Sequence, residues 1–112
     1  MPIVTINGFS QRTNVDLKEL KNQVRLVISQ VAKLDIKSEQ VSVFIPFDLC
    51  IDVEEIIVTI IIYQKPERTD TVLQEMSSNL ARFLKEKLMP GILVEVNVVT
   101  VDPKHCSSSP AA

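Results

Sequence analysis

The sequence predicts an α+β fold in which two helices cover one face of a four-stranded mixed sheet. Three observations predict it. Four short aliphatic runs alternate with two amphipathic segments in the order β-α-β-β-α-β, and the two halves of that order resemble each other. The chain has 112 residues, of which 46% are apolar and 4% aromatic, which suits one aliphatic core. We therefore expect a single domain over residues 1–102 and a polar, flexible tail over 103–112.

The first unit begins with a strand at residues 2–7 (PIVTIN), a β-branched run that ends at Gly8. A helix should follow over about 14–33, because its apolar residues recur at spacings of three and four and line one face. Thr13 and Asp16 resemble a capping box at the start of this helix.

Two further strands follow this helix. Residues 41–45 (VSVFI) form a short β-branched run closed by Pro46, and residues 55–63 (EIIVTIIIY) form a longer one. We expect residues 47–55 to be the connecting loop between them.

The second unit ends with a helix and a strand. The helix begins at 68–69, carries its apolar residues on one face and stops at the Pro90-Gly91 breaker. The final strand spans residues 92–101 (ILVEVNVVTV).

An internal repeat supports this reading. The letters IVTI at residues 3–6 recur at 57–60, an offset of 54, and Arg-Thr at 12–13 recurs at 68–69, an offset of 56. Nearly constant offsets indicate two β-α-β units, each a right-handed crossover between parallel strands.

The third predicted strand carries bulky aliphatic residues on both faces, although the two helices can cover only one face of the sheet. An apolar face of this size is typical of an interface. We therefore expect a homo-oligomer in which sheets pack on neighbouring sheets. Coverage by the tail is the weaker alternative, because SSSPAA has little to bury.

Composition argues against several functions. The net charge is −2, with 12 basic residues spread along the chain, so nucleic acid is not an expected partner. No apolar run approaches the roughly 20 residues that span a bilayer, so a membrane is not expected and we place the chain in the cytoplasm. Two separated cysteines and one histidine predict no disulfide, metal site or cofactor.

The architecture, the tandem repeat, the chain length and the Met1-Pro2 start together resemble the tautomerase superfamily over about residues 2–101. That superfamily includes the families of 4-oxalocrotonate tautomerase, malonate semialdehyde decarboxylase and macrophage migration inhibitory factor. The resemblance implies a trimer, removal of Met1, and a catalytic role for the nitrogen of Pro2. Chemically, an α-amino group titrates near ~8, and an apolar pocket beside cations lowers that value toward the working pH of a general base or acid.

The same resemblance implies which residues bind substrate. Arg12 corresponds to an arginine before the first helix in the oxalocrotonate branch, and Lys65 and Arg68 correspond to the Arg-Pro-Arg-Ser segment of the decarboxylase branch. Asn97 falls where the inhibitory-factor branch has an asparagine. The implied partner is a small anionic molecule whose carboxylate these cations would hold. The structural alternative is that both arginines are solvated residues before helix caps, that Lys65 is an exposed turn residue, and that Asn97 is a satisfied strand residue.

Three functional hypotheses follow. The first is a tautomerase or isomerase that uses Pro2 as general base or acid on a small keto or enol carboxylic acid. The second is a catalytically inactive trimeric binding or scaffold protein, in which Pro2 is dispensable. The third is a ferredoxin-like regulatory or RNA-binding domain, which has the same element order in an antiparallel sheet. Parallel pairing of residues 2–7 with 41–45 would exclude the third.

Overall fold

The computed structural model confirms the predicted order of elements. It describes residues 2–9, 16–46, 55–88 and 91–107. The strands and α-helices are β1 (Ile3–Asn7), α1 (Leu17–Ser29), β2 (Ser42–Phe44), β3 (Glu55–Tyr63), α2 (Asp70–Lys87) and β4 (Leu93–Val101). Short 3₁₀ helices are η1 (Ala32–Leu34), η2 (Ser38–Gln40) and η3 (Pro103–His105).

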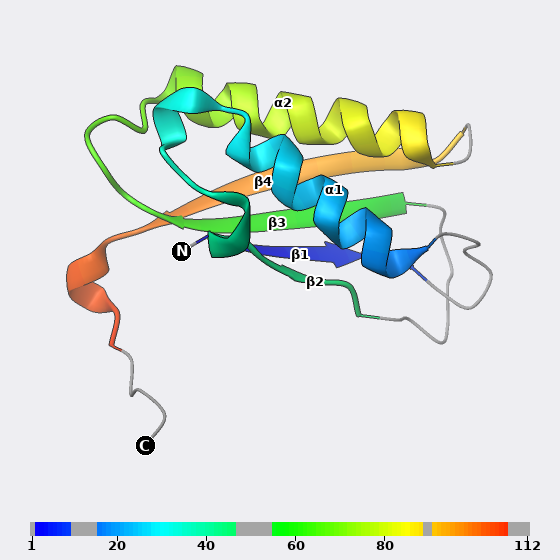
Figure 1. Ribbon diagram of the computed structural model, residues 1–112, viewed down its shortest axis with the longest axis horizontal. Helices are drawn as coiled ribbons and strands as arrows, with labels where there is room; N and C mark the ends of the chain where they lie inside the picture. Colours follow the sequence, from blue (N-terminus) through cyan, green and yellow to red (C-terminus); the bar gives the residue numbers. More distant parts are fainter. Residues whose placement is uncertain (1, 10–15, 47–54, 89–90, 108–112) are drawn as a thin grey trace.

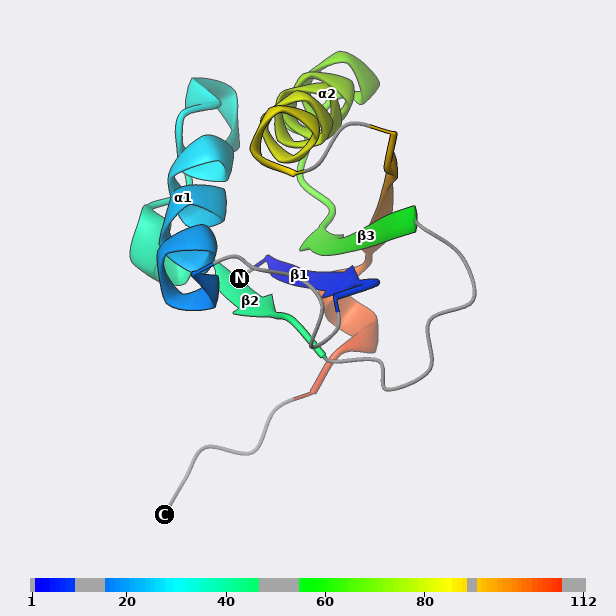
Figure 2. The ribbon, with the colours of Figure 1, turned by 90° about the vertical axis from the view of Figure 1, so that its right-hand side faces the viewer.

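The four strands form one sheet in the order β2-β1-β3-β4. The pairs β1–β2 and β3–β4 are parallel, and the central pair β1–β3 is antiparallel. Both helices lie on one face of this sheet (Figures 1 and 2). The molecule is thus two β-α-β units joined by the central pair. The parallel β1–β2 pairing excludes the ferredoxin-like alternative.

Helix α1 is shorter than the periodicity predicted. Asp16, rather than an earlier residue, caps it, because the Asp16 carboxylate accepts hydrogen bonds of 3.1 and 3.2 Å from the backbone N–H groups of Lys18 and Glu19. The predicted cap residue Thr13 lies outside the described residues. The helix ends at Ser29 rather than near residue 33, because Val31 is extended and η1 follows it.

The core lies between the helices and the inner face of the sheet. Alternate strand residues point inward, and the helices contribute the apolar positions that their periodicity predicted. The fully buried large side chains are Val4, Ile6, Phe9, Leu20, Val24, Ile28, Leu34, Ile60, Ile62, Met76, Leu80 and Leu84. No helix in the described ranges is long and apolar enough to cross a membrane.

The other face of the sheet, which we call the outer face, is uncovered in the single chain (Figure 2). Its exposed large apolar side chains are Ile3, Phe44, Ile61, Leu93 and Val99. Their positions alternate with buried residues along β1, β2 and β3 and with half-buried residues along β4, as the sheet pleat requires. The prediction that the sheet carries aliphatic residues on both of its faces is therefore confirmed.

Candidate functional site

Pro2 lies at the edge of the sheet where β1 begins and β3 and β4 end. The register pairs Ile3 with Ile61, so its continuation by one residue puts Pro2 beside Ile62, which itself pairs with Thr100. Pro2 is buried, and its carbonyl oxygen accepts a 3.0 Å hydrogen bond from the backbone N–H of Ser42. Pro2 is thereby held against β2.

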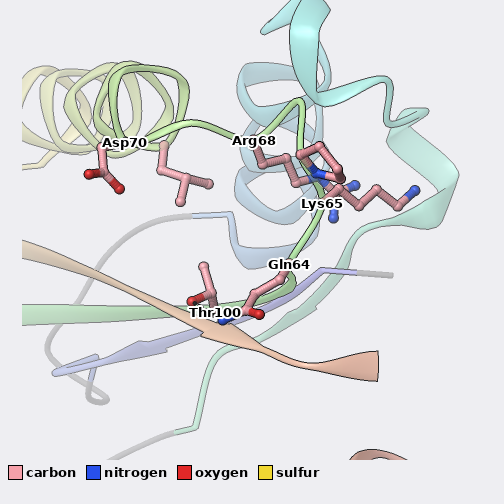
Figure 3. A pocket seen from close by; sticks show the side chains of 7 residues that line it. Gln64, Lys65, Arg68, Asp70 and Thr100 are labelled. Carbon is pink, nitrogen blue, oxygen red and sulfur yellow. Dashed lines mark hydrogen bonds between the residues drawn. The ribbon is translucent and has the colours of Figure 1, made fainter. Parts of the chain in front are cut away.

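A cavity of about 460 Å³ opens at the same edge. It lies between the carboxyl ends of β3 and β4 and the beginning of α2 (Figure 3). Its lining residues are Gln64, Lys65, Pro66, Arg68, Asp70, Leu73 and Thr100. Because neighbouring strands are about 4.8 Å apart, two strand spacings, or about 10 Å, separate the backbones of Pro2 and Thr100. Pro2 itself is not among the lining residues.

The two predicted cations Lys65 and Arg68 both line this cavity, but their surroundings differ. Lys65 is exposed, and in Figure 3 its side chain extends away from Asp70. Arg68 is half-buried and donates to two backbone carbonyl oxygens, that of Tyr63 at 2.7 Å and that of Leu34 at 3.4 Å. Lys65 is therefore the more available of the two for a ligand.

Burial also affects the charge of Arg68. Desolvation lowers the pKa of its guanidinium from the ordinary value, while the nearby charges of Glu67 and Asp35 act in the opposite direction. An arginine remains protonated at neutral pH under such a shift. Arg68 thus adds a fixed positive charge to this edge of the sheet.

Three polar lining residues were not predicted as site residues from the sequence: Gln64, Thr100 and Asp70. The Gln64 side-chain amide donates to the Thr100 hydroxyl at 3.5 Å, joining the ends of β3 and β4. Asp70 is the first residue of α2, where a carboxylate favours the positive end of the helix dipole. The only feature of the sequence that could have identified them as site residues is that each lies near the start or end of a predicted helix or strand.

Of the other two predicted residues, the structure describes only Asn97. Asn97 is exposed on the outer face, paired with Thr59 in the middle of β4, and does not line the cavity. Arg12 lies outside the described residues. Of the three predicted ligand-binding residues that the structure describes, Lys65 and Arg68 therefore lie together and Asn97 does not.

The cavity suits a small anion better than a metal. It presents two cations, one carboxylate and a neutral amide–hydroxyl pair, so a carboxylate could lie near Lys65 while a carbonyl or hydroxyl group contacts Gln64 and Thr100. Within the part of the chain that the structure describes, no group of three or more His, Cys, Asp or Glu side chains could hold a metal ion.

Comparison with solved structures identifies the fold. A macrophage migration inhibitory factor-like protein from Entamoeba histolytica superposes with a TM-score of 0.72 at 12% identity, covering 96% of this chain and 95% of that one. Malonate semialdehyde decarboxylase gives 0.69 at 12% identity, covering 98% and 92%. A fused 4-OT, described as a symmetric trimer, gives 0.68 at 13% identity, covering 96% and 93%.

These likenesses confirm the predicted fold: the chain has the α+β fold that these structures share. No family model and no curated protein matches the sequence.

Proposed function

We propose that this protein is a tautomerase or isomerase that moves a proton between carbon and oxygen of a small keto or enol carboxylic acid. The observation that carries the proposal is that Pro2 and a cation-lined cavity lie at the same edge of the sheet, in a fold shared with enzymes such as malonate semialdehyde decarboxylase. The proposal requires that Met1 is removed, because an acylated prolyl nitrogen is not basic.

In the proposed reaction Pro2 is the general base and then the general acid. Its free secondary amine takes a proton from the carbon next to the substrate carbonyl, and an enolate forms. Lys65 holds the carboxylate, and the amide and hydroxyl groups of Gln64 and Thr100 contact the oxygen on which charge develops. The protonated amine then returns the proton to the other position, so the reaction needs no cofactor.

Two malonate semialdehyde decarboxylases of the same fold support a role for an N-terminal proline and for a small carboxylate. Malonate semialdehyde decarboxylase was studied with the proline at its first position replaced by alanine. Another malonate semialdehyde decarboxylase of this fold is inhibited by 3-bromopropiolate, a small carboxylate. The same compound is therefore a suitable probe of the cavity described above.

We further propose that the active form is a homotrimer. The outer face exposes large apolar side chains in the single chain, and the fused 4-OT of the same fold is a symmetric trimer. Burying apolar area of this kind stabilises association. Asn97 lies on this face, so in such an assembly it would face a neighbouring subunit rather than its own cavity.

The decisive experiment combines mass spectrometry of the intact protein with a kinetic assay. We expect the mass to lack Met1, phenylenolpyruvate to be tautomerised, and Pro2→Ala to lower kcat at least a hundredfold, in the range typical of general base catalysis. Pro103→Ala is the matched control, because Pro103 is exposed and lies beyond β4. Inhibition by 3-bromopropiolate should weaken in Lys65→Gln.

Two outcomes would contradict the enzyme proposal. Retention of Met1 would leave no basic nitrogen at Pro2, and equal rates for Pro2→Ala and the wild type would show that Pro2 is dispensable. A trimer with equal, negligible rates would favour the binding or scaffold function instead.

A further inference from the structure

We infer that Arg68 is a positioning residue that ties the turn lining the cavity to the ends of β3 and η1, and that it is not the ligand of the substrate carboxylate. The inference rests on the proposed function for its kinetic consequences. Its structural content, a tether between three chain segments, stands independently of that function and is tested independently below.

The guanidinium of Arg68 spans segments that are far apart in sequence. One terminal nitrogen donates to the carbonyl oxygen of Tyr63 at the end of β3, and the other donates to the carbonyl oxygen of Leu34 at the end of η1. Its Nε is buried and has no hydrogen-bond partner among the described residues. Each terminal nitrogen of the fork that would hold a carboxylate therefore already donates one N–H to backbone, which fixes the direction of the guanidinium.

The Tyr63 carbonyl identifies where this tether lies. The Gln64 N–H donates to the Val101 carbonyl at 2.8 Å, so the backbone of Gln64 faces β4. Backbone groups alternate in direction along a strand, so those of Tyr63 face β1. In the β1–β3 register, continued by one residue beyond Ile3 and Ile61, Ile62 lies beside Pro2. Arg68 thus binds the carbonyl of the residue that directly follows Ile62.

Arg68 also shapes the turn that carries Lys65. The Arg68 backbone N–H donates to the Lys65 carbonyl at 3.0 Å, which closes the turn between β3 and α2. With the side chain fixed to Tyr63 and Leu34, both ends of this turn are held. The Lys65 side chain is exposed and has no hydrogen bond or ion pair with any described residue, so its ammonium is left to bind the anion.

The charges around the tether support a fixed guanidinium. Asp35 and Glu67 lie close enough to favour its charged form against the cost of burial. Asp35 has a left-handed backbone with a φ of 52°, directly after the carbonyl that Arg68 binds. A lysine cannot replace this arrangement, because its single ammonium does not present two donors in a planar fork.

The test compares Arg68→Lys, Arg68→Gln and Lys65→Gln. Hydrogen exchange should speed up on the order of tenfold at residues 65–68 and 32–35 in both Arg68 variants, because each loses a charge-assisted bond to backbone. Lys65→Gln should leave this exchange unchanged. With phenylenolpyruvate, both Arg68 variants should lower kcat more than they raise KM, whereas Lys65→Gln should mainly raise KM.

Unchanged exchange in Arg68→Gln would overturn the tether, whether or not the protein is a tautomerase. A KM that rises in Arg68→Gln and stays at the wild-type value in Arg68→Lys would also overturn it, because charge alone would then suffice for binding. If the wild type has no tautomerase activity, the proposed function fails while the exchange measurements still decide the role of Arg68.

Discussion

Ile61 and Val99 lie side by side on the outer face of the sheet, paired in the parallel register of β3 and β4, with 37% and 45% of their surfaces exposed. Ile3 stands on the other side of Ile61 in the antiparallel register of β1 and β3. The three side chains form a continuous apolar row that the helices of the same chain cannot reach, since both helices lie on the opposite face (Figure 2).

The first prediction concerns self-association through this row. Val99→Glu should convert the proposed trimer to monomer in sedimentation or light-scattering measurements, because three carboxylates would be buried without partners. Leu26→Glu is the matched control, since Leu26 is 51% exposed but lies on α1. Equal mass for Val99→Glu and the wild type would argue against the outer face as the interface.

The second prediction concerns the glycine after β1. Gly8 has a φ of +114°, and a Cβ there would collide with the backbone carbonyl oxygen of Glu55. Gly8→Ala should therefore destabilise the protein by about 3 kcal/mol in urea unfolding, from backbone strain and the clash together. Gly91 also has a positive φ, of +91°, but open space around its Cβ position. Gly91→Ala should cost only about 1 kcal/mol, and equal losses would contradict the steric argument.

The third prediction concerns the carboxylate in the cavity. Asp70 lines the cavity together with Lys65 and Arg68, so its charge opposes the binding of an anion. Asp70→Asn should tighten inhibition by 3-bromopropiolate by several-fold at low salt and slightly lower the melting temperature, because a carboxylate at the start of α2 favours the helix. Glu75→Gln provides a control on the same helix outside the cavity lining. Weaker inhibition in Asp70→Asn would contradict the proposed anion site.

The fourth prediction concerns the start of α1. Asp16→Ala removes the side chain that accepts from the first backbone N–H groups of the helix, and should cost about 1 kcal/mol of unfolding free energy. Asp16→Asn should retain most of that stability, since an asparagine oxygen caps nearly as well. Comparable losses in the two variants would show that charge, rather than the hydrogen bond, is responsible.

Most of the fold was predictable because its signals are local. Spacings of three and four placed Leu20, Val24 and Ile28 on the buried face of α1, and the same pattern placed Met76 and Leu80 on that of α2. The boundaries of α1 were less predictable. Periodicity continues through Val31, but the backbone leaves the helix at Gln30 and turns into η1, a choice that propensity alone does not reveal.

The candidate site was also only partly predictable from the sequence. The positive charges at Lys65 and Arg68 were expected from the residues themselves, whereas the hydrogen bond between Gln64 and Thr100 was not. Those two residues are 36 positions apart and meet only because β3 and β4 pair in one particular register. The placement of Asn97 on the outer face follows from the same register.

The amino-acid sequence by itself determined the element order, the buried faces of both helices, the duplicated β-α-β plan and the apolar outer surface, because each depends on the period of neighbouring residues. The long-range arrangement came only from the folded chain: which strand ends meet beside Pro2, and which carbonyl oxygens bind Arg68. These contacts join residues as distant as Leu34 and Arg68, and no local pattern encodes them because they depend on how the helices and strands pack together.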